Sequence, residues 1–164
     1  KGQKIRTMEN SYHMDFWKAL KANPTPMTFS EVYIGLQQKT IDAQENPYEV
    51  IVSSKLYEQQ DYVVETNHLP HYISLIVSDE FYKDLPKDQQ KIISEAAETA
   101  KEYARKASDE RIEDRMKVIK DSGTKIVRLD KKTQEDVRKA SSDIYKSIEE
   151  NVSKDVFDAY LNQK

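Results

Sequence analysis

The chain has 164 residues, of which 37% are hydrophobic and 34% are charged, so it holds about one domain with enough apolar residues for a core. It has no cysteine, which excludes disulfide scaffolds, thiolate metal sites and cysteine nucleophiles. Its 26 basic and 29 acidic residues give a formal net charge of −3. The chain therefore lacks the excess of basic residues that is typical of nucleic-acid-binding proteins. No apolar run reaches the roughly 18 residues that cross a bilayer, so we expect no direct membrane insertion.

The first part of the chain mixes short strands and helices. It opens on lysine, with no apolar leader and no lipid-anchor cysteine, which indicates a mature chain or a piece of a longer one. A strand is predicted at 4–8 and a helix at 10–21, which prolines 24 and 26 end because proline cannot continue the hydrogen-bond ladder. Further predicted elements are an extended segment at 26–29, a helix at 31–38 capped by Ser30, strands at 40–43, 62–66 and 72–77, a helix with Pro47 in its first position, and a short helix at 80–83.

A long helix is predicted between Pro86 and Ser122, because no proline or glycine interrupts this stretch and Gly123 ends it. If continuous, it spans roughly 55 Å, more than the roughly 40 Å diameter of a compact domain of this size. Its apolar stripe is interrupted near residue 108. Two alternatives stay open: two helices with a kink, or one helix that touches two bodies, of which one is absent.

A strand at 125–129 and helices at 133–150 and 152–161 complete the chain. The alternation of strands and helices predicts an α/β layered fold.

The search for catalytic motifs finds none. Three glycines cannot supply a dinucleotide loop, a phosphate loop and a nucleophile elbow. The pair His68-x-x-His71 lies in a turn at Pro70, without an acidic residue at ligand spacing. We therefore predict a surface or hydrogen-bonded structural role for it rather than a metal site. No catalytic residue, metal or cofactor is predicted, and the protein is not expected to be an enzyme.

Three side chains remain as candidates for binding. Arg6 lies in a strand whose carboxyl end would face a ligand crevice, where arginine can hold a carboxylate with two parallel hydrogen bonds. The alternative is a structural salt bridge. Asn46 precedes a helix, and it either caps that helix or faces a ligand at the same crevice, where the helix N-terminus favours anions. Phe29 is either an apolar plate on a rigid extended segment or a core residue.

An ordered series of segments resembles the DctP-type solute receptors of TRAP transporters (tripartite ATP-independent periplasmic transporters). The resemblance extends from residue 1 to about residue 125. The segments are Lys4-Ile5-Arg6, the run from Ala22 to Tyr33, Leu36-Gln37-Gln38, the run from Ile41 to Pro47, Lys55-x-Tyr57-Glu58, Thr66-Asn67-His68 and Leu85-Pro86.

The resemblance implies a periplasmic binding protein-like lobe of a two-lobed receptor, with a long helix that spans both lobes. It places the signature arginine on Arg6, the ligand-facing asparagine on Asn46 and the aromatic plate on Phe29. It also implies that Met8, Glu9 and Asn10 line the same cleft. Lys21 and Lys39 depart from the family, which usually has glycine or another small residue there, and Ala43 often replaces a glycine. These departures affect turns rather than the carboxylate site.

The resemblance also implies a division of the chain. Residues 1–71 would form the ligand-binding lobe, and residues 72–111 would supply a strand and long helix that pack on a missing N-terminal lobe. Residues 112–164 would return to the first lobe.

The expected function is that of an extracytoplasmic, periplasmic component that captures a carboxylate-containing solute and delivers it to TRAP membrane subunits. A sugar acid is favoured and a C4-dicarboxylate comes second, because Glu9 would repel an additional negative charge. The alternative function is the ligand-sensing domain of a bacterial signalling receptor with the same fold.

Overall fold

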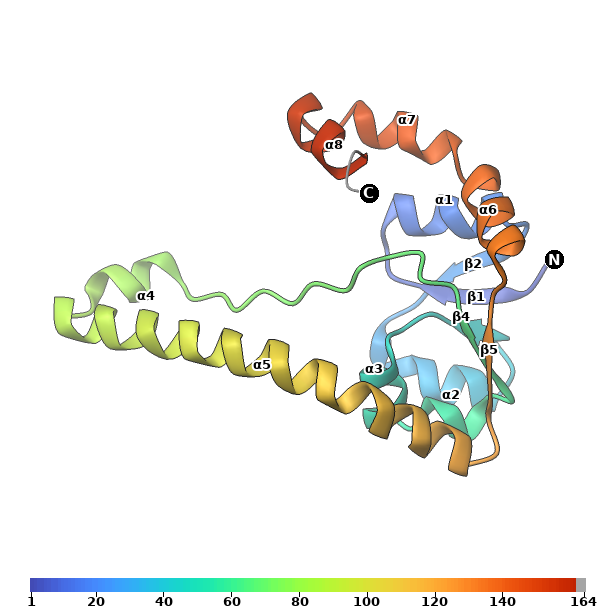
Figure 1. The fold of residues 1–164 in the computed structure, drawn as a ribbon, viewed down its shortest axis with the longest axis horizontal. Helices are drawn as coiled ribbons and strands as arrows, with labels where there is room; N and C mark the ends of the chain where they lie inside the picture. The colour runs from blue at the N-terminus through green and yellow to red at the C-terminus, as the bar shows by residue number, and fades with distance from the viewer. Residues whose placement is uncertain (162–164) are drawn as a thin grey trace.

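The computed structural model describes residues 1–161 and has the α/β fold that the sequence predicts (Figure 1). Its main sheet has three parallel strands in the order β2-β1-β3, with β1 at Lys4–Thr7, β2 at Asn23–Pro26 and β3 at Ala43–Gln44. The chain leaves β1 toward one neighbour and then crosses to the other. The central strand β1 therefore stands at a topological switch point, where the carboxyl ends of parallel strands form a crevice.

Helices cover the sheet and complete a small core. Helix α1 (Ser11–Ala19) and helix α2 (Val32–Gln37) lie on opposite sides of the sheet (Figure 1), and the 3-10 helix η1 (Phe29–Glu31) precedes α2. Helix α3 (Tyr48–Ser53) and the 3-10 helix η2 (Leu56–Gln59) follow β3. A second sheet pairs β4 (Tyr62–Glu65) with β5 (Lys125–Arg128) in parallel. The buried core consists of Val32, Leu36, Ile41, Ile51, Leu56 and Ile119.

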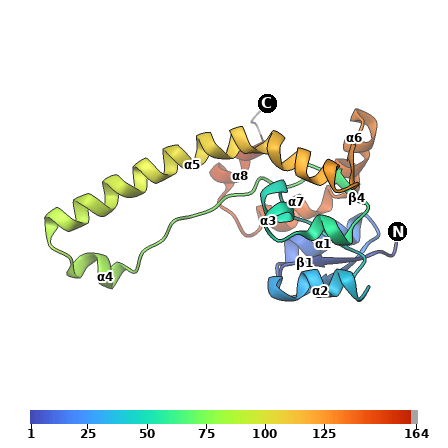
Figure 2. The same cartoon turned by 90° about the horizontal axis from the view of Figure 1, so that it is seen from below.

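The long helix α5 (Lys87–Asp121) is continuous over 35 residues, about 52 Å at the standard rise. The uninterrupted alternative is therefore the one observed. Its C-terminal part packs on α3, where the Arg115 guanidinium holds the Glu49 carboxylate at 2.7 and 3.2 Å. Its N-terminal part projects away from the rest of the molecule together with α4 (Asp79–Asp84; Figures 1 and 2). Gly123, with φ of +95°, follows the helix as predicted.

The strand predicted at 72–77 is wrong, because this segment has no regular structure. Its apolar side chains are in solvent, with Ile73 and Ile76 each 86% exposed. A β-strand needs a neighbour to bond its backbone, and none pairs with this segment within residues 1–161. The segment runs as a single extended trace from the lobe to α4 (Figure 1).

Other local expectations also need correction, among them the strand expected at 40–43, which is β3 at Ala43–Gln44. Ser30 lies inside η1 rather than capping α2, and Thr28 precedes η1. Pro47 is the N-cap residue of α3, one position earlier than expected. The single helix expected at 133–150 is two helices, α6 (Lys131–Ala140) and α7 (Asp143–Glu149). Between them, the Ser141 hydroxyl bonds to backbone carbonyls of the preceding turn.

Helix α8 (Lys154–Leu161) follows α7. None of the helices in the described part of the chain combines the length and the apolar character that crossing a membrane requires.

Lys21 and Lys39, which stand where the family usually has a small residue, adopt the backbone conformation that these turns require. Lys21 and Lys39 have φ of 63° and 59°, in the left-handed region that favours glycine. The turns therefore form with lysine present, and each lysine bears the steric cost of this conformation.

Candidate functional site

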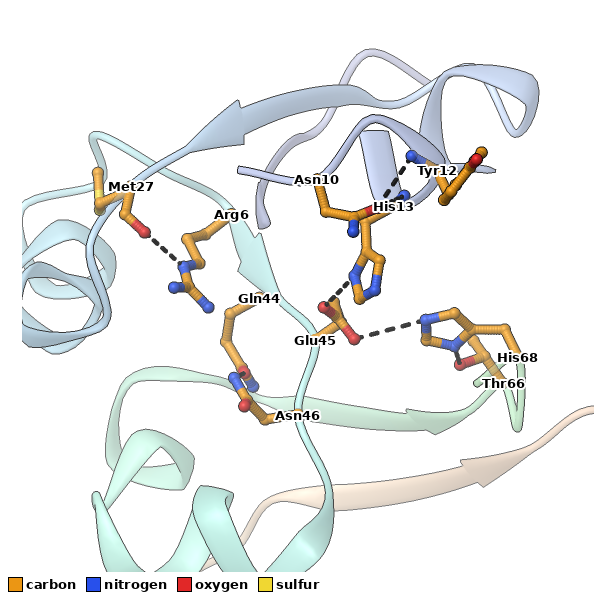
Figure 3. A network of polar contacts seen from close by, with 10 residues as sticks. All are labelled: Arg6, Asn10, Tyr12, His13, Met27, Gln44, Glu45, Asn46, Thr66 and His68. Atoms are coloured by element: carbon orange, nitrogen blue, oxygen red, sulfur yellow. Dashed lines mark hydrogen bonds and ion pairs between the residues drawn. The ribbon is translucent and has the colours of Figure 1, made fainter. Parts of the chain in front are cut away.

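Arg6 is a buried cation that a backbone carbonyl orients. The residue is 5% exposed, and its Nε donates to the Met27 carbonyl oxygen at 2.9 Å (Figure 3). Within residues 1–161, no carboxylate lies in ion-pair distance of Arg6, and its two terminal nitrogens have no protein acceptor. The structural salt bridge considered as an alternative is therefore absent from this part of the chain.

The surroundings of Arg6 act on its charge in two directions. Burial lowers the pKa of the guanidinium, and the negative charge of Glu45 acts in the opposite sense. The terminal nitrogens are not among the fully buried atoms without a hydrogen-bond partner in the described residues, so they remain accessible at the site. An anion that reaches them would form charge-assisted hydrogen bonds with a cation whose burial disfavours its charge.

Phe29 forms one wall beside the guanidinium. The Cζ atom of Arg6 lies 5.7 Å from the centroid of the Phe29 ring, within the range of a cation–π contact. The ring is 44% exposed, so the alternative of a core residue does not hold. Phe29 was expected on an extended segment, but it is the first residue of η1. Strand β2 ends three residues earlier, at Pro26.

Asn46 lies beside Arg6 through the register of the sheet. Arg6 on β1 is opposite Gln44 on β3, and the Nδ2 atom of Asn46 donates to Gln44 Oε1 at 2.7 Å. Gln44 Nε2 in turn donates to Gln60 Oε1 at 3.1 Å. The expected alternative that Asn46 caps α3 is wrong, since Pro47 occupies that position without a side-chain bond. Figure 3 shows Arg6, Gln44 and Asn46 grouped at one side of the site.

Glu45 forms a second polar cluster next to this group. Its two carboxylate oxygens lie 3.3 Å from His13 Nδ1 and 3.4 Å from His68 Nε2, and His68 Nδ1 lies 2.7 Å from the Thr66 hydroxyl (Figure 3). Burial raises the pKa of Glu45, but the contacts with the two histidines outweigh it and hold the pKa below its usual value. The ring of His68 also stacks on Phe16. In the described residues, no group of three side chains could hold a metal ion.

Sequence reasoning missed this cluster. It found no acidic residue at ligand spacing from His68, but Glu45 reaches it from the loop after β3, 23 positions earlier in the chain. The one available indication was the position of Glu45 between Gln44 and Asn46, at the carboxyl end of a strand.

The segment after β1 supplies the remaining candidate residues. Met8 and Glu9 are exposed, at the carboxyl end of the central strand. Asn10 is the N-cap of α1, and its side-chain oxygen accepts from the backbone N–H groups of Tyr12 and His13 at 3.0 and 3.2 Å. The structure thus brings all three to the same edge as Arg6, but the Asn10 oxygen is engaged by its own helix.

The fold and the site define an α/β lobe whose switch point holds an arginine without an ion-pair partner in residues 1–161. The chain matches the family of bacterial extracellular solute-binding proteins, family 7 (DctP), over residues 1–151, and it belongs to that family. This confirms the resemblance seen in the sequence.

Three known proteins illustrate the similarity. The 2,3-diketo-L-gulonate-binding periplasmic protein YiaO of Escherichia coli is 35% identical over 140 residues, which are 83% of this chain and 42% of that protein. A TRAP periplasmic solute-binding protein from a Polaromonas species, bound to D-erythronate, superposes with a TM-score of 0.89 at 34% identity, over 96% of this chain and 52% of that one. Another TRAP periplasmic solute-binding protein, from Shewanella oneidensis with bound succinate, has a TM-score of 0.88 at 31% identity. The superposition covers 97% of this chain and 52% of that one.

The chain spans between about a third and a half of the length of the curated relatives that it matches. The family and these relatives are solute-binding transport proteins, which leaves the signalling-receptor alternative without support.

Proposed function

We propose that the protein is the solute-binding component of a TRAP transporter and captures a carboxylate-containing solute for uptake through the transporter's membrane subunits. The observation that carries the proposal is Arg6, a buried guanidinium whose terminal nitrogens lack an acceptor in residues 1–161. Its Nε bond to Met27 fixes the orientation, so the other nitrogens can meet both oxygens of one carboxylate. Such a bidentate, charge-assisted pair is among the stronger hydrogen-bonded contacts in proteins.

The other site residues have defined roles in this proposal. Asn46 supplies directional hydrogen bonds beside the carboxylate, and Phe29 covers an apolar part of the ligand. Met8, Glu9 and Asn10 line the same edge. No cofactor takes part. Closure of a second lobe over these groups would exclude water and strengthen each electrostatic contact.

The preferred ligand is a sugar acid, and a C4-dicarboxylate is second. The charge balance supports this order, because Arg6 faces the charge of Glu45 and Glu9 is exposed nearby. A second ligand carboxylate would be repelled by these acids. Two of the similar proteins are described with sugar acids, at 34% and 35% identity, and one with succinate, at 31%.

Residues 72–111 would pack on a second lobe. Support comes from the exposed apolar side chains at 72–77 and from the greater length of the relatives. With residues 1–71 and 112–164 forming the ligand-binding lobe, α5 would then span both lobes. The extracytoplasmic location rests on family membership and on the periplasmic relatives.

Calorimetry on the full-length protein tests the function. Native mass spectrometry of the purified protein identifies any co-purified solute, and titrations then compare D-erythronate and D-galacturonate with succinate. We expect binding of a sugar acid with succinate weaker or absent. Binding of succinate without either sugar acid would overturn the ligand class, and binding of no carboxylate would overturn the function.

A further inference from the structure

We infer that Tyr48 and Glu49, the first two residues of α3, are positioning residues that hold both connections to a second lobe and so raise the affinity for the solute. This inference rests on the proposed function and adds a mechanism of preorganisation to it. One connection is the segment 66–78, which leaves the lobe after β4, and the other is α5, which returns to it (Figure 1). We call the bonds from Tyr48 and Glu49 to these connections the α3 clamp.

The Tyr48 phenol bonds to the end of β4, where the first connection begins. Its hydroxyl donates to Glu65 Oε1 at 2.6 Å, and Glu65 is the last residue of β4. Both residues are half-buried. Burial, followed by the bond to Glu65, raises the pKa of Tyr48, so the phenol stays protonated and remains a donor. This bond fixes the last residue before the segment 66–78.

The Glu49 carboxylate holds the other connection. The Arg115 guanidinium donates two hydrogen bonds to it, at 2.7 and 3.2 Å, in the bidentate geometry that adds specificity to strength. These hydrogen bonds lower the pKa of Glu49 and raise that of Arg115. Arg115 lies on the C-terminal part of α5, which lies beside α3 in both views (Figures 1 and 2). The pair therefore joins α3 to the helix that would span both lobes.

The clamp follows the candidate binding site directly in the chain. Only Pro47 separates Tyr48 from Asn46, and the proline ring restricts the backbone at this junction. The site residues of this loop and the residues that hold the two connections are therefore on one short, restricted stretch of chain.

The clamp acts by ordering the connections before the solute is enclosed. Closure of a second lobe must fix the lobe ends of both connections, and the loss of their conformational freedom opposes binding. Neither bond of the clamp involves the solute, so both can form before it binds and reduce that loss. Removal of either bond should therefore weaken binding, mainly through faster dissociation, without a change in the groups that touch the solute.

The test uses calorimetry and stopped-flow kinetics on the full-length protein, with D-erythronate or, if it binds more tightly, succinate. The main variant is Tyr48→Phe, which removes only the hydroxyl and leaves Glu65 its ion pair with Arg128. We expect the affinity to be about fivefold weaker, the size of one hydrogen bond, with most of the change in the dissociation rate. The matched control is Tyr33→Phe, which should bind like the wild type, because the Tyr33 hydroxyl donates to Glu58 at 2.8 Å and holds neither connection.

Charge exchange tests the Glu49 bond. Glu49→Arg alone places two cations together and should weaken binding about three- to fivefold. Addition of Arg115→Glu restores an ion pair and should recover most of the affinity. The control is Asp136→Asn, which breaks an exposed ion pair with Lys132 at 2.6 Å within α6 and should leave the affinity unchanged.

Hydrogen exchange separates positioning from general destabilisation. Before the acid is added, Tyr48→Phe should speed the exchange of the amides at 62–66 by about fivefold, the size of one hydrogen bond. Saturating acid should remove this difference, because the closed protein orders the connection by itself. A purely structural role would also speed exchange around Ile119 in the core, and the difference would persist with the acid bound.

Wild-type affinity of Tyr48→Phe, failure of Arg115→Glu to rescue Glu49→Arg, or faster exchange that extends to the core and persists with the acid would overturn the clamp. Each of these results would leave the proposed function in place. A wild-type protein that binds no carboxylate would overturn both.

Discussion

Arg6 and Glu45 carry opposite charges in the same part of the site, yet the Glu45 carboxylate oxygens lie 3.3 and 3.4 Å from ring nitrogens of His13 and His68. Both oxygens of the Glu45 carboxylate have a histidine neighbour, and no ion pair with Arg6 forms. The two histidines thereby hold an internal competitor away from the guanidinium. This arrangement leaves Arg6 available for an external carboxylate, while the Glu45 charge still acts on it.

The histidine contacts predict a pH dependence of stability. Because the folded-state pKa of Glu45 is held below its ordinary value of 4.5, the ionised form contributes stability above that pH. This stability is lost as the pH falls through the folded-state pKa. We expect Glu45→Gln to lower the free energy of unfolding at pH 7 by about 1 kcal/mol, with a smaller difference at about pH 3.5.

Urea unfolding midpoints at the two pH values measure this effect. Glu113→Gln, at an exposed position on α5, serves as the control and should change little at either pH. If the stability difference between the wild type and Glu45→Gln is the same at both pH values, Glu45 has an ordinary pKa and the prediction is wrong.

Among single residues, Arg6, Asn46 and Phe29 could be predicted as candidates from their positions in the chain, and the resemblance to a family implied their roles. The Glu45 cluster could not, because its members come from α1, the loop after β3 and the segment after β4. Only the fold brings them together. The same holds for Gln60, which reaches Gln44 from 16 positions further along the chain.

At the scale of elements, the turns at Lys21 and Lys39 carry a removable strain. A non-glycine residue in the left-handed region costs about 1–2 kcal/mol, and glycine recovers this at an entropic cost of about 0.5–1 kcal/mol. We expect Lys39→Gly to stabilise the protein by about 0.5–1 kcal/mol. Thermal or urea denaturation measures the change.

Lys18→Gly is the matched control, because Lys18 lies within α1, where glycine costs about 1 kcal/mol relative to a good helix former. The two substitutions should therefore change the free energy of unfolding in opposite directions. A destabilising effect at both positions would mean that Lys39 makes contacts that outweigh its backbone strain.

The elements themselves were predicted to different degrees. The strand at β1 and the long helix α5 follow from local patterns, since β-branched residues and an uninterrupted run of helix formers decide them within the chain. The strand expected at 72–77 has the right composition, but a strand forms only with a partner. The division of α6 from α7 at Ser141 and Ser142 is not marked by proline or glycine, so helical periodicity alone does not reveal it.

For the whole molecule, the projecting half of α5 and the exposed apolar segment at 72–77 predict a missing contact surface. In the full-length protein we expect the amides of 72–77 to be protected from hydrogen exchange by at least about tenfold relative to the isolated chain. The physical reason is that pairing on a second lobe would bond a backbone segment that pairs with no strand in residues 1–161.

Hydrogen exchange read by mass spectrometry measures this protection in both forms of the protein. The helix end around Ile119, which is already buried in the core, is the internal control and should exchange slowly in both forms. Equally fast exchange of 72–77 in the two forms would contradict the proposed packing of residues 72–111.

The most direct measurement titrates D-erythronate into full-length wild-type protein and the Arg6→Lys variant. Lysine keeps the charge but cannot form the two parallel bonds, so we expect the affinity to be about 10- to 100-fold weaker. Arg128→Lys, at an exposed arginine paired with Glu65, should bind like the wild type. Equal affinity of Arg6→Lys and wild type would contradict the assignment of Arg6 as the carboxylate-binding residue.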